Sequence, residues 1–151
     1  MRIYLDACCL SRLTDDQSQL RLRAEAESVE QIMRLVRERL AIWVSSTVLN
    51  LDVSRNPDPG RRRDAEALLS FANEIVVPKA AEANRARHIG ELGFGSFDAL
   101  HLAVAEQATV DVFLTTDDGI LRRARQNLGL LRVRVENPVS WYMELQDDSH
   151  E

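Results

Sequence analysis

Four aspartates near the ends of predicted strands and the starts of predicted helices are the residues of this chain most suited to chemistry. Asp6 and Asp117 each follow an apolar stretch, whereas Asp52 and Asp98 lie in the early turns of two predicted helices. Carboxylate oxygens gathered without cysteine or histidine ligands favour hard cations such as Mg²⁺ or Mn²⁺. Such ions clamp phosphate oxygens and activate water, so these residues predict phosphodiester hydrolysis.

The elements that must position these aspartates alternate between strand and helix. Strands are predicted over 3–5, 41–45, 75–77, 110–114 and 133–135, and helices over 21–40, 47–53, 61–72, 80–92, 97–104, 118–127 and around Trp141. The strands are apolar throughout, which is typical of a parallel sheet covered on both faces. We therefore expect one α/β domain over 1–146, with three α/β/α layers and a mostly parallel central sheet of about five strands. The acidic stretch 147–151 is predicted to be a disordered tail.

In such a sheet, ligands bind outside the carboxyl ends of the strands, near the point where the strand order reverses. Asp6 and Asp117 lie at this edge because each ends a strand, and the helix of Asp52 leaves the second strand from the same edge. The helix of Asp98 precedes a strand, so its N-terminus also starts there. Taken singly, each aspartate can be explained as a turn, N-cap or helix-dipole residue. Taken together, they would repel one another unless cations balance their charge.

Length, composition and charge limit the alternatives. The 151 residues, 45% hydrophobic and 28% charged, fit one soluble domain. The N-terminus lacks the pattern of a signal peptide and no apolar run approaches membrane-spanning length, so we expect a cytoplasmic protein without a membrane partner. The net charge of -5 argues against a wholly basic nucleic-acid surface. Phosphate contacts would rest on the arginine clusters 61–63 and 122–125, which otherwise are solvated helix faces.

The remaining cysteine and histidine residues do not favour another kind of site. Cys8 and Cys9 are neighbours, so a bridge between them would be strained, and reduced thiols are expected. Neither has a paired histidine, which disfavours a catalytic thiol. His101 lies three residues after Asp98 on a mainly apolar helix, and we interpret it as structural.

Several segments together resemble the PIN domain, in particular the VapC-like toxins of toxin-antitoxin pairs. They are Ile3-Tyr4-Leu5-Asp6, Ser46 to Asp52, Phe97-Asp98-Ala99-Leu100-His101-Leu102-Ala103 and Leu114-Thr115-Thr116-Asp117. The resemblance implies a Mg²⁺- or Mn²⁺-dependent ribonuclease in which Asp6, Asp98 and Asp117 are metal ligands and Asp52 completes the site. Thr116 keeps the hydroxyl beside the last acid. It further implies an RNA substrate and an antitoxin that covers the site, and small domains of this kind often form homodimers.

Two departures from the family pattern leave an alternative open. Asp52 stands where glutamate is more frequent, and Ala7 and Cys8 follow the first aspartate where a small hydroxyl residue is usual. A PIN module that binds protein or RNA without hydrolysis would fit these departures. Two other folds with acidic strand ends are disfavoured. A receiver domain needs a lysine at the end of its last strand, where 133–138 has none, and a haloacid-dehalogenase-type phosphatase needs an aspartate where Cys8 stands.

Overall fold

Five short parallel strands form the central sheet of the computed structural model, which describes residues 1–149. They are β1 (Arg2–Leu5), β2 (Ile42–Ser46), β3 (Glu74–Val76), β4 (Val112–Leu114) and β5 (Val135–Glu136), in the order β3-β2-β1-β4-β5. Ile3 lies opposite Trp43 of β2 on one side and opposite Val112 of β4 on the other. The predicted parallel sheet is confirmed, and each of its strand pairs is parallel.

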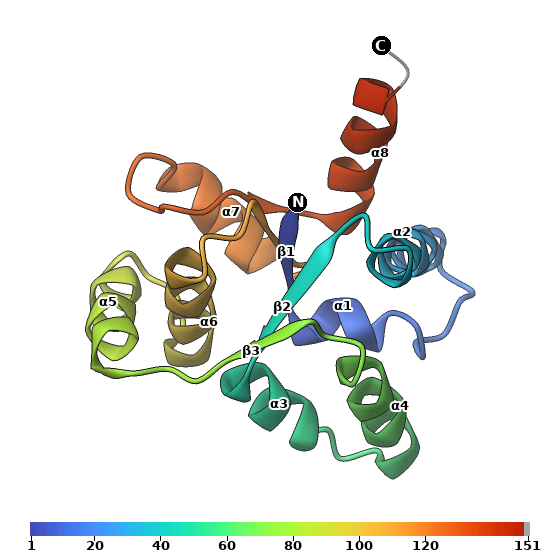
Figure 1. The fold of residues 1–151 in the computed structure, drawn as a ribbon, viewed down its shortest axis with the longest axis horizontal. Coiled ribbons are helices and arrows are strands. Elements are labelled where there is room, and N and C mark those ends of the chain that lie inside the picture. The colour runs from blue at the N-terminus through green and yellow to red at the C-terminus, as the bar shows by residue number, and fades with distance from the viewer. Residues whose placement is uncertain (150–151) are drawn as a thin grey trace.

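Helices cover both faces of this sheet. They are α1 (Ala7–Ser11), α2 (Leu20–Arg37), α3 (Thr47–Ser54), α4 (Pro59–Leu69), α5 (Ala80–Glu91), α6 (Ser96–Gln107), α7 (Asp118–Gln126) and α8 (Pro138–Ser149). Figure 1 shows α5, α6 and α7 on one side of the strands, and α1, α2, α4 and α8 on the other. This arrangement is the one that the usual right-handed crossovers would produce. The chain moves across the sheet from β1 to β3 in its first half, and it moves in the reverse direction from β3 to β4 and β5 in its second. The predicted three layers are therefore confirmed.

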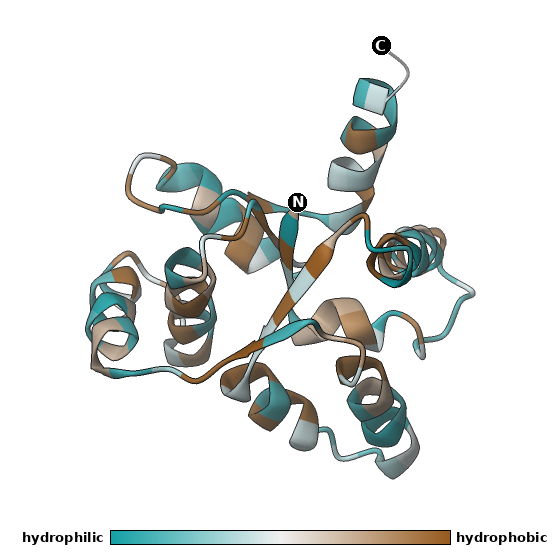
Figure 2. Ribbon diagram, viewed as in Figure 1, coloured by the Kyte–Doolittle hydropathy of each residue, from teal (hydrophilic) through white to brown (hydrophobic). Residues whose placement is uncertain are grey.

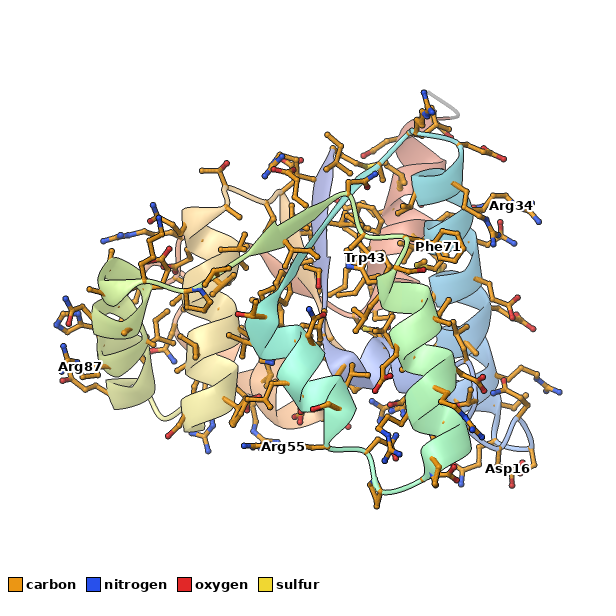
Figure 3. The ribbon with its side chains drawn as sticks, turned by 60° about the horizontal axis from the view of Figure 1, so that its bottom comes forward. Asp16, Arg34, Trp43, Arg55, Phe71 and Arg87 are labelled. Carbon is orange, nitrogen blue, oxygen red and sulfur yellow. The ribbon has the colours of Figure 1, made fainter. Side chains whose placement is uncertain are left out.

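The core fixes β1 in the middle of the molecule. Ile3, Tyr4 and Leu5 are fully buried, and Trp43 on the neighbouring strand is as well. The hydrophobic residues gather on the strands and on the helix faces that meet them (Figure 2), while charged side chains such as Arg34 project outward (Figure 3). Each large apolar side chain buried in this way contributes roughly 1.5–3 kcal/mol. Residues at the end of β1 are consequently attached to a fully buried part of the fold.

One helix was not predicted. The five-residue α1 begins directly after β1, and the side chain of Asp6 caps it by accepting a hydrogen bond from the backbone N–H of Ala7 at 2.9 Å. A helix this short completes little more than one turn, so its apolar residues cannot display the helical period. The cap nevertheless shows that the first aspartate has a structural role in addition to any chemical one.

Several predicted boundaries also differ from the structure. The helix predicted to reach Leu40 ends at Arg37, since Arg39 adopts a left-handed conformation with φ of 63° and Leu40 turns outward into solvent. The helix predicted over 97–104 begins one residue earlier, at Ser96, and continues to Gln107, and Gly95 occupies its cap position without a side-chain hydrogen bond. Of the predicted disordered tail, 147–149 belong to α8 and 150–151 lie outside the described residues.

A membrane-spanning helix is not found within residues 1–149, because none of the described helices is both long and apolar enough.

Candidate active site

The strand order reverses between β1 and β4, and this point places the first and last aspartates side by side. Strand β1 connects to β2 on one side, whereas β4 lies on its other side. The backbone N–H of Asp6 continues the parallel pairing by donating to the carbonyl oxygen of Leu114 at 2.9 Å. The carboxyl ends of β1 and β4 therefore form the crevice in which ligands bind in open parallel sheets.

Asp6 is held by hydrogen bonds to both of its carboxylate oxygens. Its Oδ1 accepts from Ala7 N, and its Oδ2 accepts from Thr115 Oγ1 at 2.8 Å and from Cys8 Sγ at 3.5 Å. Only 7% of the residue is exposed. Burial raises the pKa of Asp6, against the opposing effects of His101 and of these hydrogen bonds. The side chain is thus fixed in direction but costly to ionise.

Asp117 caps the next helix on the same edge of the sheet. Its Oδ1 accepts from Ile120 N at 3.1 Å at the start of α7, and its own backbone N–H donates to Thr115 Oγ1 at 3.1 Å. The Thr115 hydroxyl thereby joins the two aspartates, because it accepts from one and donates to the other. The shared hydroxyl group therefore holds Asp6 and Asp117 close to each other.

Asp52 reaches the site from α3 through a contact with a histidine. His101 Nε2 lies 3.2 Å from Asp52 Oδ2, and the ring is fully buried, whereas 38% of the Asp52 side chain is exposed. One ligand atom from each of Asp6, Asp52 and His101 falls within 4.8 Å of the other two. Asp6 and Asp52 therefore lie close enough together to bind the same ion.

Asp98 is coupled to the other three aspartates through their charges. Its pKa is raised from 3.8 to about 6, first by desolvation, then by the negative charges of Asp6 and Asp117 and, more weakly, of Asp52. The residue stands in the first turn of α6, where the positive end of the helix faces a carboxylate. All four predicted acids consequently share one region, although Asp98 and Asp117 lie outside the tight group formed by Asp6, Asp52 and His101.

This region carries an excess of negative charge that fits a divalent cation. Within residues 1–149, neither Asp6, Asp98 nor Asp117 forms an ion pair with arginine or lysine, and Asp52 pairs only with His101. Asp6 is buried, Asp52 and Asp98 are half-buried, and Asp117 is exposed. A carboxylate that is removed from water without such a partner, as Asp6 is, is costly unless it binds a proton or a metal. The oxygen donors present are those that Mg²⁺ and Mn²⁺ prefer.

A hollow beside Asp52 could receive part of an elongated ligand. It has a volume of about 340 Å³, and its lining includes Ala7, Asp52, Arg55 and Asn56. The guanidinium of Arg55 stacks on the ring of Phe97 at 4.8 Å from the ring centroid, and Figure 3 shows it extending from the end of α3. A basic group thus stands next to the acidic cluster.

A second arginine lies close to the start of α6. Gly93 has φ of 102°, and a Cβ on this residue would lie 2.5 Å from Nη1 of Arg123, so glycine leaves room for the guanidinium. Of the two predicted arginine clusters, 61–63 is partly used internally, since Arg61 binds Asp15 and Arg62 binds the carbonyl oxygen of Asn56. Arg122, Arg123 and Arg125 are exposed.

Comparison with known proteins agrees with this geometry. The family model of the PIN domain matches residues 3–126, which include all four aspartates. The chain belongs to the PIN domain family. The resemblance inferred from the four sequence segments is therefore confirmed, and the match covers everything from β1 to α7.

Solved structures share the fold of this PIN domain. The structure of VapBC2 from Rickettsia felis bound to a DNA fragment from its promoter is 15% identical and has a TM-score of 0.60, covering 91% of this chain and 98% of that chain. The structure of VapBC-1 from nontypeable Haemophilus influenzae is 13% identical, with a TM-score of 0.55 and the same coverage of 91% and 98%. At these identities the likeness shows the fold. The curated proteins contain no significant match.

The two adjacent hydroxyl groups of Thr115 and Thr116 in this PIN domain differ in their contacts with the acids. Thr116 was expected to support the last acid, but its Oγ1 is buried and has no hydrogen-bond partner within residues 1–149. Thr115 makes the contacts instead, and the Cys8 thiol also donates to Asp6 although no hydroxyl residue follows that aspartate. His101, interpreted as structural from its apolar helix, contacts Asp52 directly. The sequence contained one indication that His101 faces the acidic site. It lies three residues after Asp98, and this spacing places both residues on one face of the helix.

The two adjacent threonines provide a matched test of this geometry. Thr115→Val is expected to lower the free energy of unfolding by about 2 kcal/mol, because the change removes a buried hydrogen bond to Asp6 and leaves the N–H of Asp117 without its acceptor. Thr116→Val keeps the same shape and replaces a hydroxyl that has no hydrogen-bond partner among residues 1–149, so stability should stay equal or rise. Urea denaturation of both variants measures the difference. Equal losses would show that Thr115 has no special role.

Proposed function

We propose that this PIN domain is a Mg²⁺- or Mn²⁺-dependent endoribonuclease that hydrolyses RNA phosphodiesters. The observation that carries the proposal is the group of four carboxylates at the strand-order reversal, which lacks arginine or lysine partners within residues 1–149. Membership of the PIN domain family supports the nuclease assignment. We further propose that the protein acts in the cytoplasm, where RNA is its substrate.

Each acid has a distinct part in this proposal. Asp6, Asp98 and Asp117 hold the ion, and Asp52 completes the site from α3. When bound, the metal supplies positive charge that polarises the phosphate and promotes ionisation of water. Arg55 beside the hollow and Arg123 beside the start of α6 are placed to contact phosphates of the RNA on either side of the cluster. These local contacts would compensate for the negative net charge of the chain.

Binding of Mn²⁺ is the direct test of the metal site. Calorimetric titration of the metal-free protein with Mn²⁺ is expected to show binding, and the melting temperature should rise with Mn²⁺ concentration because the ion binds only the folded state. Cleavage of single-stranded RNA should require the same ion. Absence of binding at millimolar Mn²⁺ would overturn the proposal, whereas binding without cleavage would favour the second candidate described below.

We also propose that the protein is the toxin of a toxin-antitoxin pair, as the two VapBC structures with the same fold suggest. An exposed RNA-cleaving site would endanger its host, so a partner should cover it. The excess of carboxylates favours a partner segment that contributes arginine or lysine, and that segment would compete with the metal. Its binding should weaken as the salt concentration rises.

Co-expression tests the antitoxin. The product of a short reading frame beside this gene should co-purify with the chain, and the complex should cleave RNA much more slowly than the free chain. Excess Mg²⁺ should restore only part of the activity, since the basic segment and the ion compete for the same carboxylates. If a complex forms and cleaves RNA as fast as the free chain, the toxin assignment is wrong.

A homodimer is the assembly we propose. Phe71, Ile75 and Val77, in and beside the edge strand β3, each leave more than half of their surface exposed, which is typical of a contact surface. The molar mass from light scattering measures the assembly directly.

The second candidate function is a PIN module that binds protein or RNA without hydrolysis. The observation that favours it is Asp52, whose short carboxylate reaches the site through His101 and remains partly exposed. The hydrogen bonds from Thr115 and Cys8 to Asp6 argue against it, because they replace the support that a hydroxyl residue after Asp6 would provide.

A further inference from the structure

We propose that Ser46, Tyr4 and His101 form a directional hydrogen-bond relay that fixes the tautomer of His101 and holds Asp52 in position. The Tyr4 hydroxyl lies 2.7 Å from Ser46 Oγ and 2.6 Å from His101 Nδ1, while Nε2 of the same ring faces Asp52 Oδ2. Ser46, Tyr4 and His101 are all fully buried. The relay rests on the contacts of these residues alone. Its effect on metal binding rests on the proposed function.

The relay connects separate elements of the fold. Tyr4 lies in the central strand β1, Ser46 ends β2 and caps α3, and His101 comes from α6. Tyr4 also stacks on Phe113 of β4, with ring centroids 5.3 Å apart, and meets the His101 ring edge-on at 5.7 Å. The tyrosine ring is therefore held on both sides and cannot leave its hydrogen bonds without disturbing the core.

Counting protons favours one direction of the relay. Ser46 Oγ accepts from Leu49 N at 3.0 Å, as the cap of α3, and within residues 1–149 the Tyr4 oxygen is the remaining partner for the serine's own proton. The Tyr4 proton is then directed at His101 Nδ1, which must be an acceptor. A neutral ring with an unprotonated Nδ1 carries its proton on Nε2, and this proton points at Asp52.

The reverse direction is electrostatically unfavourable. If Nδ1 of His101 donated to Tyr4, and Tyr4 donated to Ser46, the lone pair of a neutral Nε2 would face the carboxylate of Asp52 at 3.2 Å. Two acceptors at that distance repel each other. An ionised Asp52 therefore selects the tautomer in which Nε2 is protonated, and the buried tyrosine reinforces that choice.

This arrangement provides Asp52 with the support that its length requires. The aspartate is one methylene shorter than a glutamate and is more than a third exposed, and within residues 1–149 His101 is its hydrogen-bond partner. Fixing the donor at Nε2 restricts where the carboxylate can lie before any ligand binds. His101 is thus a positioning residue, since it acts through Asp52, and removal of such a residue weakens metal binding by about 10-fold to 100-fold.

Nitrogen NMR of the metal-free protein tests the direction without using activity. Long-range proton–nitrogen spectra of the full chain at neutral pH should show a protonated Nε2 and an unprotonated Nδ1 for His101. In Tyr4→Phe, which keeps the stacked ring and removes the donor, the two nitrogen signals should move toward each other as both tautomers become populated. A protonated Nδ1 in the wild-type protein, with or without a proton on Nε2, would overturn the relay.

Calorimetry with Mn²⁺ then separates positioning from packing. His101→Gln retains an amide donor near the place of Nε2, whereas His101→Leu fills similar space without a donor. We expect the Leu variant to bind Mn²⁺ at least about tenfold more weakly than wild type, and the Gln variant to retain most of the affinity. Equal losses would reduce His101 to a packing residue. If Mg²⁺ displaces the Nε2 proton in the NMR experiment, His101 is a ligand and the positioning role is wrong.

The two experiments also separate this inference from the proposed function. If the wild-type protein binds no Mn²⁺, the proposed function fails, and the NMR result still decides whether the relay exists. If Mn²⁺ binds and the tautomer is the reverse one, the relay fails while the metal site stands.

Discussion

Asp98→Asn is expected to slow RNA cleavage by at least about a hundredfold, the usual effect of removing one preorganised electrostatic group. The change keeps the shape of the side chain in the first turn of α6 and removes a charge that acts together with those of Asp6 and Asp117. The asparagine cannot supply the anionic oxygen that a hard cation prefers. Single-turnover cleavage of RNA at saturating Mg²⁺ measures the loss.

A suitable control is Asp64→Asn. Asp64 is exposed on α4 and its side chain makes no hydrogen bond or ion pair within residues 1–149, so the substitution removes one negative charge without touching the site. This variant should cleave RNA at the wild-type rate. A wild-type rate in folded Asp98→Asn protein would mean that the active site lies elsewhere.

The same Asp98→Asn substitution is expected to stabilise the metal-free protein above neutral pH by about 2 kcal/mol, which is less than the full pKa shift would give because solvent screens part of the charge of this half-buried carboxylate. Desolvation and the neighbouring charges raise the pKa of Asp98 in the folded state from 3.8 to about 6, so the folded protein binds this proton more tightly than the unfolded chain. A raised pKa of this kind contributes stability that is complete below the unfolded value and is lost as the pH rises through the folded value. The loss therefore falls between about pH 4 and pH 7.

Urea denaturation of both proteins across this range isolates the effect, because the other titrating groups are common to the two. Their stabilities should agree near pH 4 and diverge as the pH rises, with the asparagine variant the more stable above pH 6. Saturating Mn²⁺ should reverse the order, since the ion stabilises only a protein that binds it. Curves that stay parallel across the range would show that Asp98 is not destabilised by its neighbours.

These two predictions have a common cause. Carboxylates that can hold a cation must be close together, and the same closeness makes them repel one another when the cation is absent. The domain offsets part of this cost with hydrogen bonds to Asp6 from Ala7, Thr115 and Cys8, and with the helix N-terminus beside Asp98. The acidic site thus lowers the stability of the metal-free protein, and the same arrangement of carboxylates allows it to bind a cation.

The sequence by itself determined which acids belong together. Apolar runs without polar alternation predicted parallel strands, and Asp6 and Asp117 had to share one edge because each follows such a strand. Ser46 stands directly before the helix predicted to start at residue 47, and its Oγ caps that helix by accepting from Leu49 N. These features depend on hydrophobic periodicity and capping, which are local properties of the chain and are therefore visible in one sequence.

Only the tertiary structure decided which neighbouring side chains support those acids. Thr115 and Thr116 are adjacent, and the sequence favoured the one beside Asp117, whereas the packing of β4 against β1 directs Thr115 toward Asp6. His101 and Tyr4 are 97 residues apart and meet because α6 packs against the sheet. Such contacts depend on strand register and on the rotation of a helix about its axis. A shift of one residue in a strand reverses the face on which a side chain lies, and no local pattern records that choice.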